Sequence, residues 1–311
     1  MARSTLAFLI LPEVHILDLA GPVQVFQEAM DHGVDISLVF CAAQASPRST
    51  CGITLGSMRP YRKVSLQRGD FLLVPGASMD YLLGRTRKDD ADLLEWVAEA
   101  HTRGVIIASV CTGAFFLGQA GLLNGRRCTT HWKRADQLQK RHPRARVEQD
   151  ILFTEDDGII TSAGVTAGID MALHIVGRLQ DEMVAYKVAR ELVVYLRRNG
   201  NESQQSIFMQ YRNHIHSGIH RVQDYLHENL HQGANLPALS EVACMSTRNL
   251  TRTFKREAGI TINRYINLVR QVRLRELTKN PNFTRKQLAR YCGLRSERQV
   301  IRLLNTLPAG A

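Results

Sequence analysis

Short apolar runs alternate with stretches of helical periodicity through the first two thirds of the chain. The apolar runs cover residues 6–11, 36–42, 70–74, 105–108 and 158–164. Consecutive apolar positions are typical of parallel strands that are buried on both faces. The stretches at 16–32, 91–103, 113–122 and 169–178 have the spacing of helices. Strands that alternate with helices predict an α/β fold with a doubly wound parallel sheet.

The last third of the chain is predicted to be all-α. A helix over 182–198 should end the α/β part, and the polar run 199–206 indicates a linker. One face of the next helix carries Ile215, Ile219, Val222 and Leu226. Further helices are predicted at 238–244, 246–258, 263–278, 286–291 and 296–302. We therefore expect an α/β domain at 1–198, a linker at 199–212 and a helical domain at 213–311.

The positive charge of the chain is concentrated in this helical domain. The net charge is +11, and residues 1–200 hold 23 cationic against 22 anionic residues. Residues 201–311 hold 17 against 7 and so account for +10 of the total. Such segregation favours an anionic partner, double-stranded DNA in particular, over a merely soluble basic surface.

The cysteines and the N-terminus indicate where the protein works. The six cysteines, at 41, 51, 111, 128, 244 and 292, form no C-x-x-C pair and have no metal-ligand spacing with histidine. This pattern predicts a reduced chain with no metal and no other cofactor. The N-terminal apolar run is too short for a signal peptide, and no stretch approaches the ~18 apolar residues of a membrane span. We expect a soluble cytoplasmic protein that does not enter a membrane.

Residues 105–132 contain the most distinctive motif of the sequence. The apolar run at 105–108 leads to Cys111-Thr112-Gly113 and then to a helix, which is the geometry of a nucleophile elbow. Because a helix N-terminus favours negative charge, the Cys111 thiol is predicted to be biased toward the thiolate and to alkylate before Cys41 and Cys128. An inert buried cysteine is the alternative. His131, twenty residues on, is the candidate neighbour of Cys111.

This stretch resembles the PfpI-like, class-I glutamine-amidotransferase-like superfamily. The motifs that carry the resemblance are A-S-V-C-T-G-A, A-G-L-L-N-G-R-R and T-T-H-W. The wording is most similar to isonitrile hydratases and to AraC-type regulators that carry this domain as a sensor. The resemblance implies that Cys111 is the elbow cysteine, with Thr112 beside it and His131 near the site. It places the acidic residue that contacts the cysteine at Asp18. A cap of a helix beginning near Gly21 is the alternative role for this aspartate.

The resemblance also implies two further walls of a pocket. Gly76 and Ala77 match a loop whose backbone N–H groups lie near the site as a cradle for an oxyanion or a carboxylate. The segment T-S-A-G-V-T-A-G-I-D, with Gly164 and Asp170, should close the pocket from another side. A favourable contact with the helix dipole is the alternative for Asp170. As in similar regulators, the ligand is expected to be a small polar metabolite such as an amino acid or a quaternary amine.

The segment S-T-R-N-L-T-R-T-F-K-R-E-A-G predicts a helix that could read DNA. Ser246 is a natural N-cap, Leu250 and Phe254 should face inward, and Gly259 should end the helix. The outward-facing polar residues are Arg248, Asn249, Thr251, Arg252, Lys255 and Arg256. In a major groove arginine reads guanine and asparagine reads adenine. A basic solvated helix is the alternative.

This segment and the following Y-I-N-L-V-R-Q-V-R-L-R-E-L resemble the first helix-turn-helix unit of the AraC/XylS family. The resemblance implies that Arg248, Thr251 and Arg252 contact DNA bases. It also implies that the helix at 263–278 joins two helix-turn-helix units, which we call head one and head two. In the second head, the DNA-facing residues are expected to be Arg298, Gln299 and Arg302.

Two departures from the family pattern affect these heads. The first helix of head one is about one turn short between Leu239 and Met245. The second head has Leu294 where phenylalanine is usual, and it is truncated before the final helix of the pattern. We therefore expect a weakly packed second head and reduced DNA affinity.

Two functions are compatible with these sequence features. One is a transcriptional regulator, with the α/β domain as sensor and the helical domain bound to DNA. The other is a cysteine-dependent enzyme of the isonitrile hydratase or amidase type with an accessory basic tail. A free-standing enzyme has no need of 17 cationic residues around two recognition-type helices. The sequence therefore favours the non-enzymatic regulator, a homodimer through its sensor domain, with DNA, a small-molecule effector and RNA polymerase as partners.

Overall fold

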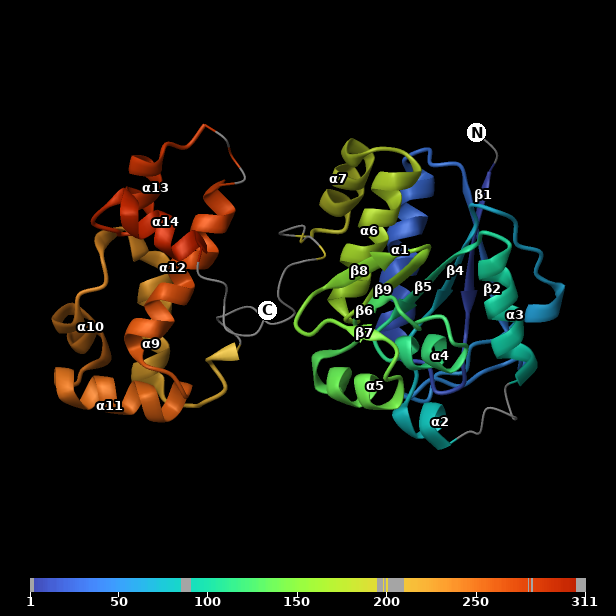
Figure 1. Cartoon of the computed structure of the whole chain (residues 1–311), viewed down its shortest axis with the longest axis horizontal. Helices are drawn as coiled ribbons and strands as arrows, with labels where there is room; N and C mark the ends of the chain where they lie inside the picture. The colour runs from blue at the N-terminus through green and yellow to red at the C-terminus, as the bar shows by residue number, and fades with distance from the viewer. Residues whose placement is uncertain are drawn as a thin grey trace. The chain divides into compact units, whose positions relative to one another are not determined.

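The chain folds into two units, Met1–Gln204 and Gln205–Ala311, which we call the α/β unit and the helical unit (Figure 1). The computed structural model describes residues 3–84, 91–194, 198, 200, 210–278, 280 and 282–305. The predicted linker at 199–212 lies mostly outside the described residues. Its last residues pack against the helical unit, because the Tyr211 carbonyl accepts a hydrogen bond from Gln223 and Arg212 pairs with Asp224.

The α/β unit is built on a seven-stranded sheet of order β3-β2-β1-β4-β5-β9-β8. Its strands are β1 (Ser4–Leu9), β2 (Ile36–Ala42), β3 (Arg59–Pro60), β4 (Phe71–Val74), β5 (Ile106–Val110), β8 (Phe153–Asp156) and β9 (Ile159–Ser162). Neighbouring strands are parallel except for the antiparallel pair β8 and β9. The predicted doubly wound α/β fold is confirmed, with one antiparallel edge strand.

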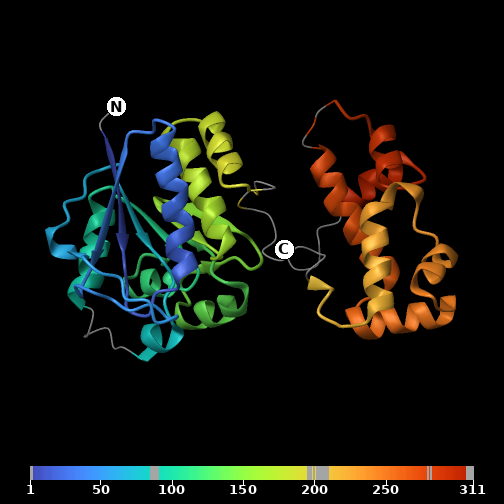
Figure 2. The same cartoon turned by 180° about the vertical axis from the view of Figure 1, so that it is seen from behind.

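Helices cover both faces of this sheet. One face is covered by α1 (Ile16–Asp31), α6 (Thr166–Leu179) and α7 (Glu182–Glu191), which Figure 2 shows side by side. The other face is covered by α2 (Met79–Gly84), α3 (Ala91–Thr102), α4 (Gly113–Gln119) and α5 (Ala135–Arg141). A short ribbon of β6 (Arg127–Cys128) and β7 (Arg146–Val147) and two 3-10 turns, Tyr61–Lys63 and Trp132–Arg134, complete the unit.

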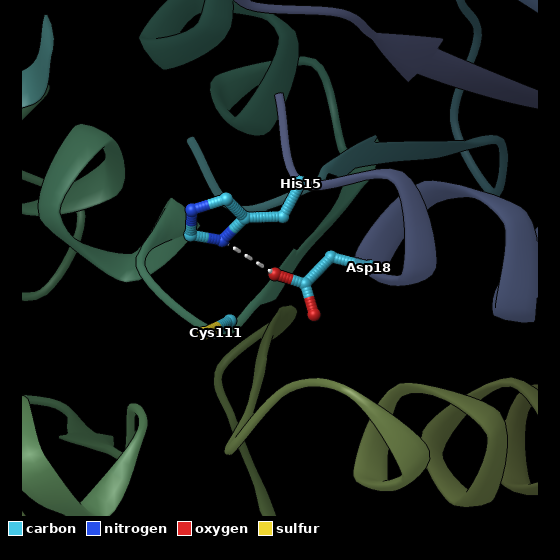
Figure 3. A group of neighbouring side chains, drawn as sticks. All are labelled: His15, Asp18 and Cys111. Atoms are coloured by element: carbon cyan, nitrogen blue, oxygen red, sulfur yellow. Dashed lines mark hydrogen bonds and ion pairs between the residues drawn. The ribbon is translucent and has the colours of Figure 1, made fainter. Parts of the chain in front are cut away.

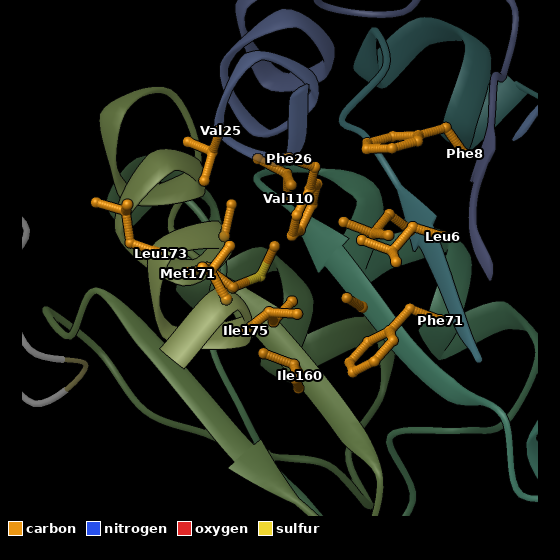
Figure 4. Close-up of a cluster of buried hydrophobic side chains, with 14 of the residues drawn as sticks. Leu6, Phe8, Val25, Phe26, Phe71, Val110, Ile160, Met171, Leu173 and Ile175 are labelled. Carbon is orange, nitrogen blue, oxygen red and sulfur yellow. The ribbon is translucent and has the colours of Figure 1, made fainter. Parts of the chain in front are cut away.

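The apolar runs of the sequence become strands because both of their faces are buried. In β1, Leu6 and Phe8 pack into the core under α1 and α6, whereas Ala7 and Leu9 pack into the core on the opposite face. This alternation follows from the two-residue repeat of a strand. Figure 4 shows the first of these cores, where side chains of the strands meet those of α1 and α6.

The helix predicted over 182–198 is wrong in its second half. α7 ends at Glu191, and Val193 has a φ of +54°. A β-branched residue in that region cannot continue a helix. Arg198, well beyond the helix, is instead bound to the side of α6, as described below. The start of α6 at Thr166 is also three residues earlier than the predicted start at 169.

The helical unit confirms the predicted all-α region. Its helices are α9 (Ser217–Glu228), α10 (Leu236–Ala243), α11 (Thr247–Ala258), α12 (Ile262–Thr278), α13 (Arg285–Tyr291) and α14 (Glu297–Asn305), with a 3-10 turn at Leu230–Gln232. The prediction for Ile215 is wrong, because this side chain precedes α9 and is fully exposed.

The helical unit contains two hydrophobic cores that share one helix. α9, α10, α11 and the first part of α12 form one core, and α13, α14 and the end of α12 form the other. Tyr265 of α12 lies in the first core, and Leu274 of the same helix lies in the second. This arrangement gives two small bundles joined by α12. No helix among the described residues is long and apolar enough to cross a membrane.

Candidate functional site

The candidate site lies where four strands of the α/β unit end. β1 runs into the segment with His15 and Asp18, β4 into Gly76, β5 into Cys111 and β9 into Gly164. The sheet order places β2 on one side of β1 and β4 on the other, so the direction of winding changes between β1 and β4. Ligands of doubly wound sheets bind at the carboxyl ends of the strands near such a point.

Cys111 occupies the predicted elbow between β5 and α4. It has a φ of +56°, which is uncommon for a residue with a side chain, and it is only 5% exposed. Its N–H donates to the Ser162 carbonyl at 2.9 Å, and its carbonyl accepts a hydrogen bond from the Thr130 hydroxyl at 2.8 Å. These contacts hold the strained backbone in place. The predicted strand, sharp turn and helix are therefore present.

Asp18 lies beside Cys111, within the first turn of α1. The alternative role as a cap of a helix beginning near Gly21 is wrong, because α1 begins at Ile16. The Asp18 carboxylate is 1% exposed, and its Oδ1 accepts a 2.7 Å hydrogen bond from the Val165 N–H. Val165 immediately precedes α6, so this bond joins the starts of α1 and α6 at the site.

The histidine that contacts Asp18 is His15, which the sequence analysis missed. His15 Nδ1 lies 3.3 Å from Asp18 Oδ2. A ring nitrogen of His15, a carboxylate oxygen of Asp18 and the sulfur of Cys111 all lie within 4.8 Å of one another (Figure 3). The spacing of three residues at a helix start was a signal that could have identified His15, because such residues share one side of the first turn.

The predicted histidine, His131, lies near the site and is bonded to its own turn. Its Nδ1 accepts a hydrogen bond from the Lys133 N–H at 3.3 Å, so it caps the following turn, and its ring stacks on Trp132. Burial and the nearby charge of Lys133 lower the pKa of His131 below its usual range. Thr130 binds the Cys111 carbonyl, and the charges of Asp18 and His15 also act on the His131 imidazole, so His131 borders the site while its Nδ1 caps its own turn.

Two glycines allow the site to be this tight. A Cβ on Gly76 would lie 2.8 Å from Thr112 Oγ1 and 3.1 Å from Cys111 Cβ, and it would also clash with Asp18. A Cβ on Gly164 would lie 2.8 Å from Cys111 Sγ, and this glycine has a φ of +94°. Both predicted site positions therefore border Cys111, and any side chain at either would displace it.

Thr112 and Ala77 satisfy each other. The Thr112 hydroxyl donates to the Ala77 carbonyl at 2.7 Å and accepts from the Ala77 N–H at 3.0 Å. The expectation that the Ala77 N–H serves as an oxyanion cradle is wrong, because Thr112 already occupies it. The pair instead joins the turn after β4 to the start of α4.

The electrostatics of Cys111 reverse the prediction of a thiolate. Burial and the neighbouring Asp18 carboxylate raise the pKa of Cys111 far above its usual value, and the opposing hydrogen bond from Thr112 is the smaller effect. The favourable field of a helix N-terminus is thus outweighed, and the thiol stays protonated at neutral pH. Burial also raises the pKa values of Cys41 and Cys128, each to about 12.

A role as a pocket wall does not by itself account for Asp170. Its carboxylate, 3% exposed, accepts hydrogen bonds from the Arg198 Nε at 3.0 Å and from the Arg198 N–H at 3.1 Å. Arg198 also donates to Thr166 Oγ1 at 2.9 Å. The dipole alternative is likewise insufficient, because Asp170 forms a buried ion pair. This pair fastens the chain after α7 to the first turns of α6.

The predicted DNA-reading helix is α11. Ser246 accepts a hydrogen bond from the Asn249 N–H, Gly259 ends the helix with a φ of +74°, and Leu250 and Phe254 are fully buried. The exposed cationic residues on the opposite face are Arg248, Arg252, Lys255 and Arg256. The local fold is therefore as predicted, with a basic outer face.

Some of the predicted DNA contacts are half-buried and locally bonded. Asn249 Oδ1 accepts hydrogen bonds from Arg252 and Thr253, and the Thr251 hydroxyl donates to backbone carbonyls of its own helix. Arg256 pairs with Glu257. In α14, Arg298 and Arg302 are exposed, and Gln299 Oε1 accepts the Arg295 N–H.

The model of the DJ-1/PfpI family matches residues 4–178. Among solved structures, a THiJ/PfpI family protein from Pseudomonas syringae is similar, with a TM-score of 0.55 and 27% identity over 67% of this chain and 81% of that chain. The match covers the strands and helices that form the Cys111 site.

Two kinds of curated relative are similar to this chain. The HTH-type transcriptional regulator GbdR of Pseudomonas aeruginosa is 28% identical over 192 residues, which is 61% of this chain and 52% of the regulator. This chain therefore spans about half the length of that relative. The isonitrile hydratase of Pseudomonas putida is 32% identical over 175 residues, 56% of this chain and 71% of the hydratase.

Proposed function

This chain belongs to the DJ-1/PfpI family, and we propose that it is a sequence-specific DNA-binding regulator of transcription. In this proposal the helical unit binds double-stranded DNA, and the α/β unit senses a small molecule at the Cys111 site. The similarity to a regulator named as HTH-type supports the proposal.

The observation that carries the proposal is the construction of α11. The helix is capped at both ends and buries one apolar stripe, so its position on the bundle is fixed. Its other face projects Arg248, Arg252 and Lys255 into solvent. A rigid helix with exposed arginines can enter a major groove, where arginine reads guanine and lysine contacts phosphate. The charge of +10 on residues 201–311 attracts DNA from a distance.

α14 and α12 extend this argument to a second contact with DNA. α14 carries Arg298 and Arg302 on an exposed face and has its own core against α12 and α13. Because α12 contributes to both cores, the two bundles are held on one rod. We expect α11 and α14 to enter successive major grooves of one duplex.

Contacts around the Cys111 site support a sensing role for the α/β unit. Asp18 binds the Val165 N–H, and the next residue, Thr166, binds Arg198, which lies close before the start of the helical unit. A ligand that displaces Asp18 would disturb the first turn of α6 and therefore the Asp170–Arg198 ion pair. The effector proposed for this site is a small polar metabolite such as an amino acid or a quaternary amine. Dimerisation through the α/β unit and contact with RNA polymerase belong to the same proposal.

Selection of bound duplexes from a random DNA pool by the purified full chain tests the proposal. We expect enrichment of a defined sequence with two contacted segments about one helical turn apart. A second selection in the presence of candidate metabolites should change the amount of DNA retained. A pool that stays random after repeated rounds, at moderate salt, would contradict sequence-specific binding.

A cysteine-dependent enzyme is the second candidate. Cys111, Asp18 and Thr112 are brought together, and the isonitrile hydratase of Pseudomonas putida is a relative. An enzyme of this kind should turn over an isonitrile or a small amide at ordinary rates, ~1–10³ s⁻¹, and Cys111→Ser should abolish turnover. The raised pKa of Cys111 argues against a nucleophilic thiolate. Rapid turnover by the wild type would favour this candidate over the regulator.

A further inference from the structure

We propose that the Cys111 site binds a divalent metal ion of the zinc type through Cys111 Sγ, Asp18 Oδ2 and His15 Nδ1. As a ligand class for the sensing site, the inference rests on the proposed function, but the binding itself is measured without DNA. No metal was predicted from the sequence, because the cysteines have no metal-ligand spacing with histidine and Cys111 is far from His15 and Asp18 along the chain.

The geometry of the three side chains fits a small metal ion. All three ligating atoms lie within 4.8 Å of one another, and the Asp18 Oδ2 to His15 Nδ1 distance is 3.3 Å. Two ligands at ~2.0 Å from a tetrahedral zinc ion are separated by about 3.3 Å. This edge of the tetrahedron is therefore already formed, and small shifts of the Cys111 side chain complete the set. Thiolate, imidazole and carboxylate are the ligands that zinc uses.

The ligands are held in place by contacts from their backbone or their second atom. The other oxygen of Asp18 accepts the Val165 N–H, and the His15 N–H donates to the Gly76 carbonyl at 2.8 Å. The backbone of Cys111 is fixed on both sides. Such outer contacts orient metal ligands and raise their affinity.

The charge balance of the site favours a divalent cation. Asp18 is a buried carboxylate that accepts a hydrogen bond from the Val165 N–H and lies against the His15 imidazole. On binding, the Cys111 S–H bond breaks, a sulfur–metal bond forms and the proton passes to the buffer. Thiolate, carboxylate and a 2+ ion then sum to zero, which removes the cost of a buried net charge. An imidazole ligand from His15 adds no charge to this sum.

The fourth position of the metal would be open on the side of His15, whose side chain is 36% exposed. In catalytic zinc sites, which have three protein ligands, a water molecule occupies the fourth position. A carboxylate of an amino-acid effector could replace this water. The metal would then be part of the surface that recognises the effector.

Titration of the metal-free full chain with Zn²⁺ alone, and with Co²⁺ as a spectroscopic probe, tests the inference. We expect one tight site per chain, about one proton released per ion in buffers of different ionisation enthalpy, and a sulfur-to-cobalt charge-transfer band. Cys111→Ser should remove the band, and Asp18→Asn and His15→Gln should each weaken binding at least ~10-fold.

Two control variants separate this site from adventitious binding. Cys51 is an exposed thiol, and His214 and His220 have rings 4.5 Å apart in the helical unit. Cys51→Ser and His220→Gln should leave the tight site and the cobalt band unchanged. Loss of the band in Cys51→Ser, or of binding in His220→Gln, would overturn the assignment.

The result stays decisive if Cys111→Ser fails to fold. His15 is half-exposed, so His15→Gln is expected to fold as the wild type does, and its thermal unfolding is measured in parallel. Unchanged Zn²⁺ affinity in folded His15→Gln and Asp18→Asn, or no tight site in the wild type, would contradict the inference. DNA selection by the metal-free chain is independent of these outcomes and tests the proposed function separately.

Discussion

The Cys111 site and the outer face of α11 are built in opposite ways. At the Cys111 site, segments after four different strands converge on buried side chains, and two glycines border the cysteine. On α11, the exposed cationic side chains all come from one continuous helix, and its helical periodicity places them on the face opposite the buried residues. The first region depends on long-range packing, whereas the second depends mainly on local helix geometry.

This difference indicates how each region can change. An added side chain at Gly76 or Gly164 disturbs the packing of the α/β unit, because its Cβ would meet the atoms of Cys111. A substitution on the face of α11 can alter binding and leave the fold intact. Such a division suits a regulator, in which the sensing site is fixed by the fold and the DNA-reading residues vary freely.

Gly164→Ala should have the largest effect. The new Cβ would meet Cys111, and the φ of +94° is unfavourable for alanine. We expect a loss of about 2–5 kcal/mol in the free energy of unfolding. Gly33→Ala is the matched control, because Gly33 has a φ of +87° but nothing within 4 Å of its Cβ position. The control should cost about 1–2 kcal/mol.

Tryptophan fluorescence during chemical denaturation measures the free energy of unfolding of both glycine variants. Both tryptophans, Trp96 and Trp132, lie in the α/β unit, so denaturation followed by their emission reports on this unit alone. Equal losses for the two glycine variants would show that the crowding around Cys111 is not as described.

Arg198→Ala should have the next largest effect. It removes the buried ion pair with the Asp170 carboxylate, which is 3% exposed, and we expect a loss of about 2–3 kcal/mol in the free energy of unfolding of the α/β unit. Arg62→Ala removes a pair with Asp92 in which both side chains are more than half exposed, and it should cost less than ~1 kcal/mol. The same tryptophan signal compares them. An unchanged free energy of unfolding in Arg198→Ala would contradict the proposed link between α6 and the chain that follows α7.

The cysteines should differ in their rates of alkylation. Cys51 is exposed, and a hydrogen bond from Ser49 lowers its pKa, whereas the pKa of Cys111 is raised by burial and Asp18. Near neutral pH, Cys51 should react with iodoacetamide roughly 100-fold faster than Cys111, as measured by peptide mass spectrometry. Since its pKa is raised, Cys111 should gain thiolate only as the pH approaches that pKa. Faster labelling of Cys111 would restore the thiolate prediction.

Substitutions on α11 should have smaller and more selective effects. Arg252→Ala should cost ~1–3 kcal/mol in binding to a selected duplex and relax the preference at one base pair. Lys255→Ala should weaken binding to all sequences alike. It should also reduce the slope of the logarithm of the binding constant against the logarithm of the salt concentration by about one. Lys187→Ala, an exposed lysine of α7, is the control and should change neither. Identical changes in sequence preference for the first two variants would contradict the assignment of α11.

The regular elements could be predicted from the sequence because their causes are local. The strand at residues 36–42 was predicted residue for residue, since a continuous apolar run between polar turns allows few alternatives. The N-cap Ser246 and the C-terminal Gly259 of α11 were also found, because capping depends on neighbouring residues.

The contacts within the Cys111 site could not be predicted in the same way. His15 and Asp18 share the first turn of α1, but their place beside Cys111 depends on the bond between the turn after β1 and Gly76 after β4, which no local pattern encodes. The pairing of Asp170 with Arg198 was hidden because the apolar stripe appeared to continue the helix past Glu191. In both cases a contact between distant segments decides the role of a side chain.

Competition binding of the wild-type chain to its selected duplex tests the central claim most directly. Fluorescence anisotropy at one stated salt concentration compares the selected duplex with a shuffled duplex of the same composition. A sequence-specific regulator should prefer the selected duplex by ~10³-fold or more. Equal affinity for the two duplexes, with the same dependence on salt, would show that the helical unit binds DNA only through its charge and would contradict the account.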